Sequence, residues 1–270
     1  MESNLSDKNA SRPDSPFRVS VVVPMHNEEP LVDTFLDRME SVFDKFSCDY
    51  EIVCVNDGST DGTLAKLLER RKLCSRIVVV DLSRNFGKES ALTAGIDIAT
   101  GDALIPIDAD LQDPPELIPQ MIEKWRAGYD VVYGVRTDRG ADTAVKRWTA
   151  GGFYRFYNRV ADTPIPLDTG DFRLIDRRVA EVLRQLPERN RFMKGLFAWV
   201  GFKQTSVEYA RSKRSAGRTK WNYWRLWNFA MDGVTSFSTL PLRVWSYVGS
   251  LVALISFLGS SQGSVHIERG

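Results

Sequence analysis

The chain has 270 residues, which is enough for one large domain with an appendage and a core that needs no disulfide bonds. Its 43% hydrophobic and 26% charged residues exclude an intrinsically disordered protein. The formal net charge is only +1, so no overall electric field attracts nucleic acid and we expect no nucleic-acid partner.

Cysteine and histidine usage narrows the chemistry further. The three cysteines contain no CxxC pair and are odd in number, which predicts reduced thiols in a cytosolic compartment, and small buried hydrophobic side chains are the simplest interpretation of them. Only His26 and His266 are present, which excludes a metal site built from histidines. Residues 1–16 are polar and do not resemble a signal peptide, so we expect a disordered leader.

From Phe17 onward, short apolar runs alternate with segments of helical spacing. The runs rich in β-branched residues predict strands at Phe17–Pro24, Tyr50–Asn56, Arg76–Ser83, Asp102–Asp110 and Asp130–Arg136. The segments between them predict helices at Pro30–Phe46, Gly62–Leu73, Lys88–Ala99 and Pro114–Gly128. Such alternation predicts an α/β domain with a parallel sheet and flanking helices.

The alternation stops after Arg136. A helix is expected at Val145–Val160, a short strand at Gly170–Asp176 and another helix at Val179–Leu186. A basic, aromatic region follows, and then an uncharged apolar run from Val244 to Leu258. We therefore divide the chain into the leader 1–16, a domain 17–210, a basic loop 211–220, an amphipathic helix 221–239, a short membrane segment 240–258 and a polar tail 259–270.

Polar clusters follow the first four predicted strands. They are "HNEE" at His26–Glu29, "DGSTDG" at Asp57–Gly62, "RNFGKES" at Arg84–Ser90 and "DADLQD" at Asp108–Asp113. Because ligands of open α/β sheets bind beyond the carboxyl ends of the strands, these four loops predict one binding site.

The pair Asp108 and Asp110 indicates a metal ion. Residues i and i+2 of a regular strand point the same way, so both carboxylates could converge on one cation. Oxygen ligands favour Mg²⁺ or Mn²⁺, and Mg²⁺ in proteins is usually completed by waters and substrate phosphates. The alternative is a solvated acidic loop that begins a helix, where negative charge suits the helix dipole.

Several motifs in the same order extend this pattern: "VVVPMHNEE", "VNDGSTDGT", "SRNFGKESALTAGI", "DADLQDPPE", "YGVR" and "GDFRLIDR". On these motifs, from Val19 to about Gly249, the sequence resembles the inverting nucleotide-sugar glycosyltransferases with the GT-A fold. More narrowly, it resembles the polyprenyl-phosphate glycosyltransferases, which include dolichol-phosphate mannose synthase and the bactoprenol glucosyltransferases. The resemblance implies a Rossmann-like, mostly parallel sheet with flanking helices, followed by C-terminal membrane-associated helices.

The resemblance implies a donor site for a nucleotide sugar. Asp110 would hold Mg²⁺ or Mn²⁺ on the diphosphate, Asp108 would contact the nucleotide or the ion, and Gln112 would face the sugar or diphosphate. Asp57 would accept a hydrogen bond from the base edge. The other nucleotide-sugar contacts implied are Pro24, Asn27, Glu28, Lys88, Arg214 and Lys220. The last two are the first and last residues of "RSAGRTK", which matches a mobile loop in relatives, although a solvated basic loop is the alternative.

The resemblance also implies a polyprenyl phosphate as the acceptor. Its phosphate monoester has a second pKa near 6, so at neutral pH it needs positioning more than deprotonation. Arg136 and Arg147 would clamp this phosphate, and Asp171 matches the proposed catalytic base. The alternatives are two ordinary surface arginines and an acid in a turn at the start of a strand.

The C-terminal region predicts a membrane surface as a further partner. Trp221, Trp224 and Trp227 stand among basic residues, as in a helix that lies in the lipid headgroup region, although a buried core helix would explain the aromatic residues alone. Val244–Leu258 would extend roughly 22 Å as a helix, less than the roughly 30 Å hydrocarbon core. We expect peripheral or short-span attachment to the cytoplasmic face of a membrane, most simply the bacterial inner membrane, with a homo-oligomer left open.

The reaction predicted is transfer of a sugar from a UDP- or GDP-hexose to undecaprenyl or dolichyl phosphate, with inversion. Two alternatives remain: a glycosyltransferase with a saccharide acceptor, and a non-catalytic membrane adaptor with the same fold. The QxxRW sequence of processive synthases is missing, and the basic, aromatic tail suits a lipid phosphate. No GxGxxG or GxxxxGK[ST] follows a strand, which excludes a dinucleotide oxidoreductase and a P-loop NTPase.

Overall fold

A computed structural model of the chain describes residues 16–46, 48–136, 169–186, 196, 200–209 and 240–263. Its strands are β1 (Arg18–Met25), β2 (Asp49–Asn56), β3 (Ile77–Asp81), β4 (Ala103–Pro106), β5 (Val131–Arg136), β6 (Thr169–Asp176) and β7 (Gln204–Tyr209). Its helices are α1 (Val32–Lys45), α2 (Thr63–Leu73), α3 (Lys88–Ile98), the 3₁₀ turn η1 (Pro115–Leu117), α4 (Ile118–Arg126), α6 (Arg177–Gln185) and α9 (Leu240–Gly263). The predicted helix Val145–Val160 lies outside the described residues.

The described strands form one seven-stranded sheet in the order β3-β2-β1-β4-β6-β5-β7. The pairs β1–β2, β2–β3, β1–β4 and β5–β7 are parallel, which confirms a mostly parallel sheet. The parallel arrangement expected from the alternation does not hold at β6, which is antiparallel to both β4 and β5 and makes the sheet mixed. Strand β7 was not predicted, because only Val207 and Tyr209 in it are apolar and buried.

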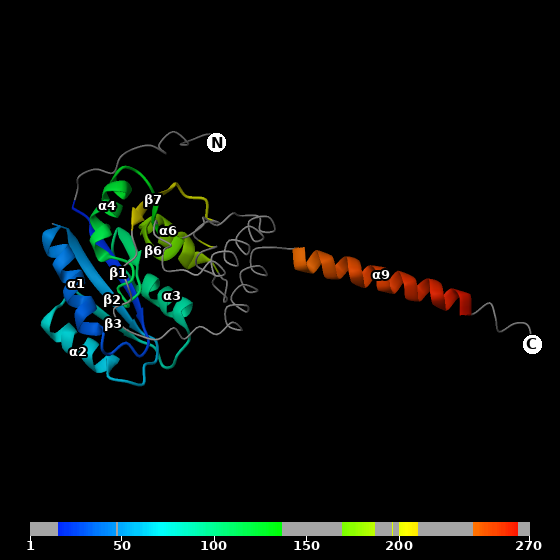
Figure 1. Ribbon diagram of the computed structural model, residues 1–270, viewed down its shortest axis with the longest axis horizontal. Coiled ribbons are helices and arrows are strands. Elements are labelled where there is room, and N and C mark those ends of the chain that lie inside the picture. Colours follow the sequence, from blue (N-terminus) through cyan, green and yellow to red (C-terminus); the bar gives the residue numbers. More distant parts are fainter. Residues whose placement is uncertain are drawn as a thin grey trace, which may run out of the picture.

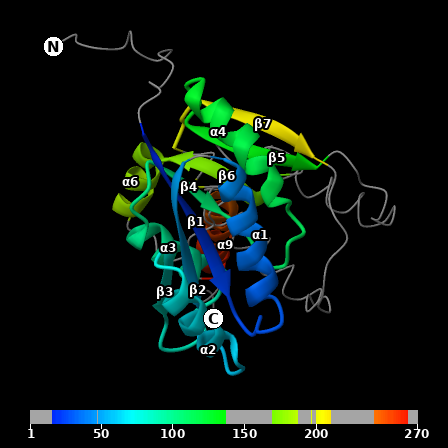
Figure 2. The same cartoon turned by 90° about the vertical axis from the view of Figure 1, so that its left-hand side faces the viewer.

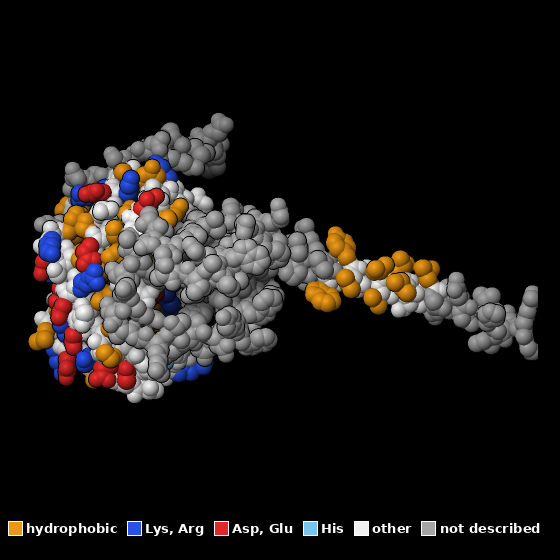
Figure 3. All heavy atoms as spheres, viewed as in Figure 1, with side chains coloured by type: hydrophobic (Ala, Val, Ile, Leu, Met, Phe, Trp, Pro, Cys, Tyr) orange, Lys and Arg blue, Asp and Glu red, His pale blue; other side chains and the backbone are white. Residues whose placement is uncertain are grey.

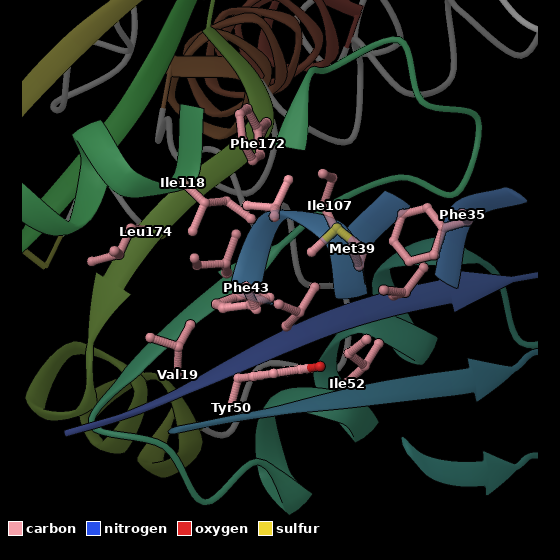
Figure 4. Close-up of a cluster of buried hydrophobic side chains, with 14 of the residues drawn as sticks. Val19, Phe35, Met39, Phe43, Tyr50, Ile52, Ile107, Ile118, Phe172 and Leu174 are labelled. Carbon is pink, nitrogen blue, oxygen red and sulfur yellow. The ribbon is translucent and has the colours of Figure 1, made fainter. Parts of the chain in front are cut away.

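Helices cover both faces of the sheet, so the domain has three layers (Figures 1 and 2). On one face, Phe35 and Met39 of α1 and Ile118 of α4 belong to one buried hydrophobic cluster, which Figure 4 shows. On the other face, helices α3 and α6 cover the strands through a second buried cluster. Because both faces are covered, Val21 and Val22 are fully buried although they point in opposite directions.

All three cysteines, Cys48, Cys54 and Cys74, are free thiols. Cys54 is fully buried in β2, and burial raises the pKa of its thiol to about 12. Burial, with the charge of Asp49, raises the pKa of Cys48 to about 11. Both thiols therefore stay protonated at neutral pH and behave as small apolar side chains. This agrees with the interpretation of the cysteines as small hydrophobic residues.

Helix α9 stands apart from the layered domain, with apolar side chains on its surface (Figures 1 and 3). Trp245, Tyr247 and Phe257 are each more than 70% exposed. Among the residues that the structure describes, no helix is both long and apolar enough to cross a membrane. The expected membrane segment 240–258 therefore does not appear as a spanning helix in the described part of the chain.

Candidate functional site

The strand order places the site at the junction of β1 and β4. From β1 the chain moves to β2 and β3 on one side, and it then returns to β4 on the other side of β1. From these two neighbouring strands the chain therefore continues in opposite directions along the sheet, and such a switch point is where open α/β sheets bind ligands. Of the four polar clusters, "HNEE" and "DADLQD" flank this junction directly.

Asp108 lies in the loop after β4, which we call the acidic loop, residues Asp108–Asp113. Strand β4 ends at Pro106, so the strand geometry used above to align Asp108 with Asp110 does not apply. The Lys88 ammonium contacts both carboxylate oxygens of Asp108, at 2.7 Å from Oδ1 and 2.9 Å from Oδ2. Lys88 is the first residue of α3, so this ion pair links the amino end of that helix, where the helix dipole is positive, to the acidic loop.

The acidic loop turns sharply at Leu111. Its φ of 55° is a left-handed conformation that costs an ordinary L-residue about 1–2 kcal/mol. Its side chain is only 2% exposed and packs in the main core, which offsets that cost. Beside the turn, Asp110 Oδ1 accepts a hydrogen bond from the Gln112 amide at 3.2 Å, so Asp110 also shapes the loop.

The loop after β1 is tied to the loop after β2. The Asn27 amide donates to Ser59 Oγ at 3.0 Å, and Asn27 Oδ1 accepts from the Thr60 amide at 2.8 Å. The Glu28 amide donates to Thr63 Oγ1 at 3.0 Å. Asn27 itself has a φ of 55°, a conformation that asparagine tolerates better than most residues. Asn27 and Glu28 therefore hold two loops of the site together, and Pro24 precedes them within β1.

Asp61 lies just before α2, whose first residue is Thr63. Asp61 Oδ1 accepts from the Thr63 amide at 3.0 Å and from the Thr63 hydroxyl at 2.6 Å. Desolvation opposes ionisation of Asp61, but these bonds and one from the Glu29 amide outweigh it and lower the pKa of Asp61. Asp61 is therefore ionised at neutral pH and fixes the rim of the site.

Asp57 joins the loops after β2 and β3. Its buried carboxylate accepts from the Phe86 amide at 2.7 Å through Oδ1 and from the Gly87 amide at 3.0 Å through Oδ2. Gly58 permits this close approach, because a Cβ there would lie 2.3 Å from the Arg84 carbonyl carbon. Asp57 thus fixes the loop that precedes Lys88. The sequence predicted only that Asp57 contacts the base of the nucleotide, and not this structural role.

His26 was not singled out as a site residue, yet it lies within this cluster. Its Nδ1 is 2.8 Å from the Asp57 carbonyl oxygen, and its Nε2 is 3.4 Å from Asn27 Nδ2. The only signal in the sequence was its position between β1 and Asn27, at the carboxyl end of a central strand.

The remaining predicted residues are described in part or not at all. Arg136 is the last residue of β5 and Asp171 lies in β6, and the structure describes the backbone but not the side chain of each. Arg147, Arg214 and Lys220 lie outside the described residues, as do the basic loop 211–220 and the amphipathic helix 221–239. The structure therefore brings together the predicted donor-site residues Asn27, Glu28, Asp57, Lys88 and Asp108.

The described side chains contain no cluster of three or more His, Cys, Asp or Glu residues that could hold a metal ion alone. The acidic loop instead offers the carboxylates of Asp108 and Asp110 and the amide oxygen of Gln112. Such oxygen donors suit a hard divalent ion that also keeps waters or ligand phosphates, so the residues fit Mg²⁺ or Mn²⁺ shared with a phosphorylated ligand.

Comparison with known proteins shows the family of this chain. Residues 20–184 match the model of the family named glycosyl transferase family 2. An uncharacterized glycosyltransferase of Synechocystis sp. is 55% identical over 245 residues, which are 91% of this chain and 77% of that protein. The bactoprenol glucosyl transferase of Shigella phage SfX is 49% identical over 242 residues, which are 90% of this chain and 79% of that protein.

A solved structure shows the same fold. The mannosyltransferase PcManGT from Pyrobaculum calidifontis, in complex with GDP-Man and Mn²⁺, aligns with a TM-score of 0.56 over 81% of this chain and 62% of that one. At 23% identity this likeness shows the fold alone, an α/β mixed sheet of the GT-A kind. The family match and the close relatives go further, and they identify this chain as an enzyme, a glycosyltransferase of glycosyl transferase family 2.

Proposed function

We propose that this glycosyltransferase moves a sugar from a UDP- or GDP-hexose to a polyprenyl phosphate, with inversion at the sugar. The observation that carries the proposal is the meeting of Lys88, the amino end of α3 and the acidic loop at the switch point of the sheet. Positive and negative groups held together there suit a diphosphate and its divalent counter-ion. The 49% identity to a bactoprenol glucosyl transferase supports the acceptor.

The donor half of the site would use the acidic loop. Asp110 and Asp108 would hold Mg²⁺ or Mn²⁺, which when bound offsets the charge that grows on the leaving nucleotide, and Gln112 would face the sugar or diphosphate. Lys88 would add a second positive charge on the same side. The remaining donor contacts proposed are Pro24, Asn27, Glu28, Asp57, Arg214 and Lys220.

The acceptor half would lie where β5 pairs with β6. The register of these strands shifts between Tyr133 and Val135, and Asp171 lies in the corresponding stretch of β6, between Thr169 and Arg173. Such irregularities often re-aim side chains beside active sites. We place Arg136 and Arg147 on the acceptor phosphate and Asp171 beside the attacking oxygen, where it orients the phosphate or takes up a proton.

The proposed acceptor is a lipid, so the enzyme would work at a membrane surface, on its cytoplasmic face, where nucleotide sugars are found. The exposed aromatic and aliphatic side chains of α9 support such contact. The membrane proposed is the bacterial inner membrane, and the oligomeric state stays open.

The decisive experiment incubates the purified protein with undecaprenyl phosphate in detergent, Mg²⁺ or Mn²⁺, and radiolabelled UDP- and GDP-hexoses one at a time. Label that passes into the lipid extract with one donor, and not with the Asp110→Asn variant, supports the proposal. Label that passes only to added oligosaccharide would favour a saccharide acceptor. Absence of binding and transfer with every donor would favour a non-catalytic adaptor.

A further inference from the structure

We propose that Tyr209 is a positioning residue that holds the acidic loop in the shape needed to bind a divalent cation. Tyr209 ends β7, a strand that the sequence did not predict. Its hydroxyl donates a hydrogen bond to Asp113 Oδ1, at the end of the acidic loop. The two residues are 96 positions apart in the chain, and both are at most 6% exposed.

The acidic loop needs support from the surrounding structure because of its backbone conformation. Leu111 is held at a φ of 55°, which an L side chain disfavours, directly after Asp110, one of the two proposed metal-binding residues. Such a turn persists only when the surrounding structure enforces it. The buried Leu111 side chain is one anchor, and the Asp113 carboxylate bound by Tyr209 is a second, two residues further on.

Tyr209 is itself rigidly held, which makes it a suitable support. Its ring meets the Phe172 ring edge-on, with centroids 6.4 Å apart and planes at 86°. It lies directly over Gly134, where a Cβ would come within 2.8 Å of Tyr209 Cε1. The ring is therefore held by packing against β5 and β6, and its hydroxyl group contacts Asp113.

The same contacts relate the acidic loop to the proposed acceptor residues. Phe172 directly follows Asp171 in β6, and Arg136 is the β5 partner of Tyr209 in the parallel register of β5 and β7. Tyr209 therefore touches the acidic loop and the strands that carry Asp171 and Arg136. The Tyr209 side chain therefore connects the loop proposed to bind the donor with the strands proposed to bind the acceptor.

The inference rests on the proposed metal role of the acidic loop, so its test measures metal binding apart from turnover. Mn²⁺ is titrated into the protein with saturating nucleoside diphosphate, and free Mn²⁺ is measured by electron paramagnetic resonance. A hydrogen bond to a charged group contributes enough to predict about tenfold weaker Mn²⁺ binding in Tyr209→Phe. Asp113→Ala should weaken binding similarly, and the double variant should be no weaker than either single variant.

Tyr50→Phe is the matched control, because Tyr50 is a buried tyrosine whose ring stacks on Phe43, away from the acidic loop. It should bind Mn²⁺ as the wild type does. If Tyr209→Phe binds Mn²⁺ like Tyr50→Phe while Asp110→Asn loses binding, the positioning role is refuted and the metal role stands. If Asp110→Asn binds Mn²⁺ normally, the metal role of the loop fails instead.

Asp113→Asn distinguishes support from direct ligation. Its amide oxygen can still accept from Tyr209, so it should bind Mn²⁺ within about threefold of the wild type if the hydrogen bond is what matters. Loss as large as in Asp113→Ala would show that the charge of Asp113 acts on the ion directly, and would overturn the inference. This comparison also decides the matter if Tyr209→Phe does not fold.

Discussion

Lys88 and Asp108 form a two-point ion pair across the carboxyl edge of the sheet, with the ammonium 2.7 Å and 2.9 Å from the two carboxylate oxygens. They come from different structural units, the start of α3 and the loop after β4. Each side chain is about two-fifths exposed, so the pair is accessible to a ligand. A phosphorylated donor can therefore approach a lysine that is already held in place.

We expect Lys88→Ala to lower kcat/KM for the nucleotide sugar by about tenfold to a hundredfold, since a charge-assisted contact contributes about 1.5–3 kcal/mol. Lys88→Arg should retain most of the activity, because it keeps the charge. Steady-state kinetics over a range of donor concentrations provides the measurement.

Lys66→Ala is the matched control for Lys88. Lys66 pairs with Asp33 at 3.2 Å, between α2 and α1 and outside the site, so its removal should leave donor kinetics unchanged. Equal effects of the Lys66 and Lys88 substitutions would remove Lys88 from the donor site.

Asp110→Asn should abolish metal-dependent transfer, with a loss of at least a hundredfold in kcat. The asparagine oxygen can still accept from the Gln112 amide, so the loop and the thermal unfolding temperature should change little. Circular dichroism and a transfer assay test both parts. Asp102→Asn, at the other edge of the sheet, removes a carboxylate that accepts from the Arg18 amide and should leave turnover near normal. Near-normal turnover in Asp110→Asn would defeat the metal assignment.

Asp57→Ala should release the loop that presents Lys88. The Phe86 and Gly87 amides lose their buried acceptor, so their hydrogen exchange should become faster by an order of magnitude or more, and donor affinity should fall with it. Asp61→Ala serves as the control, because Asp61 accepts from Thr63 and Glu29 instead. Unchanged exchange at Phe86 and Gly87 in Asp57→Ala would contradict the assignment.

Glu51 stabilises the opposite edge of the sheet. Its Oε1 accepts from Ser20 Oγ at 2.5 Å and from the Thr100 amide at 2.7 Å, and its carboxylate is buried. Burial opposes ionisation, but these hydrogen bonds and the charge of Arg18 outweigh it and lower the pKa of Glu51. Because the folded pKa lies below the unfolded value of about 4.3, this stabilisation is present above that value and is lost as the pH falls through the folded pKa.

We therefore expect Glu51→Gln to lower the free energy of unfolding at pH 7 by about 1–3 kcal/mol. The difference from the wild type should shrink as the pH is lowered from 5 towards 3. Urea unfolding of both proteins at several pH values gives this difference directly, and a difference that does not depend on pH would show that the ionised carboxylate is not the cause.

Strands β1 and β2 and helices α1 to α4 could be predicted from local patterns, because buried parallel strands are continuous apolar runs and covering helices have an apolar face. The same local patterns did not predict strand β7 or the direction of strand β6. Strand β7 lies at the sheet edge and buries only two apolar side chains, so its sequence looks like a loop. The antiparallel insertion of β6 between β4 and β5 depends on partners distant in the chain, which no local pattern records.

Within the site, the sequence by itself determined the chemical groups and their order along the chain: two aspartates and a glutamine after β4, an asparagine and a glutamate after β1, and a lysine at the start of α3. Residue types and strand ends suffice for that, since parallel strands bring their carboxyl ends to one edge. Only the tertiary structure decided which groups meet. Lys88 reaches Asp108, Asp57 binds the loop of Phe86 and Gly87, and Tyr209 reaches Asp113, because hydrogen bonds act over a few ångströms between residues that lie 20 to 96 positions apart.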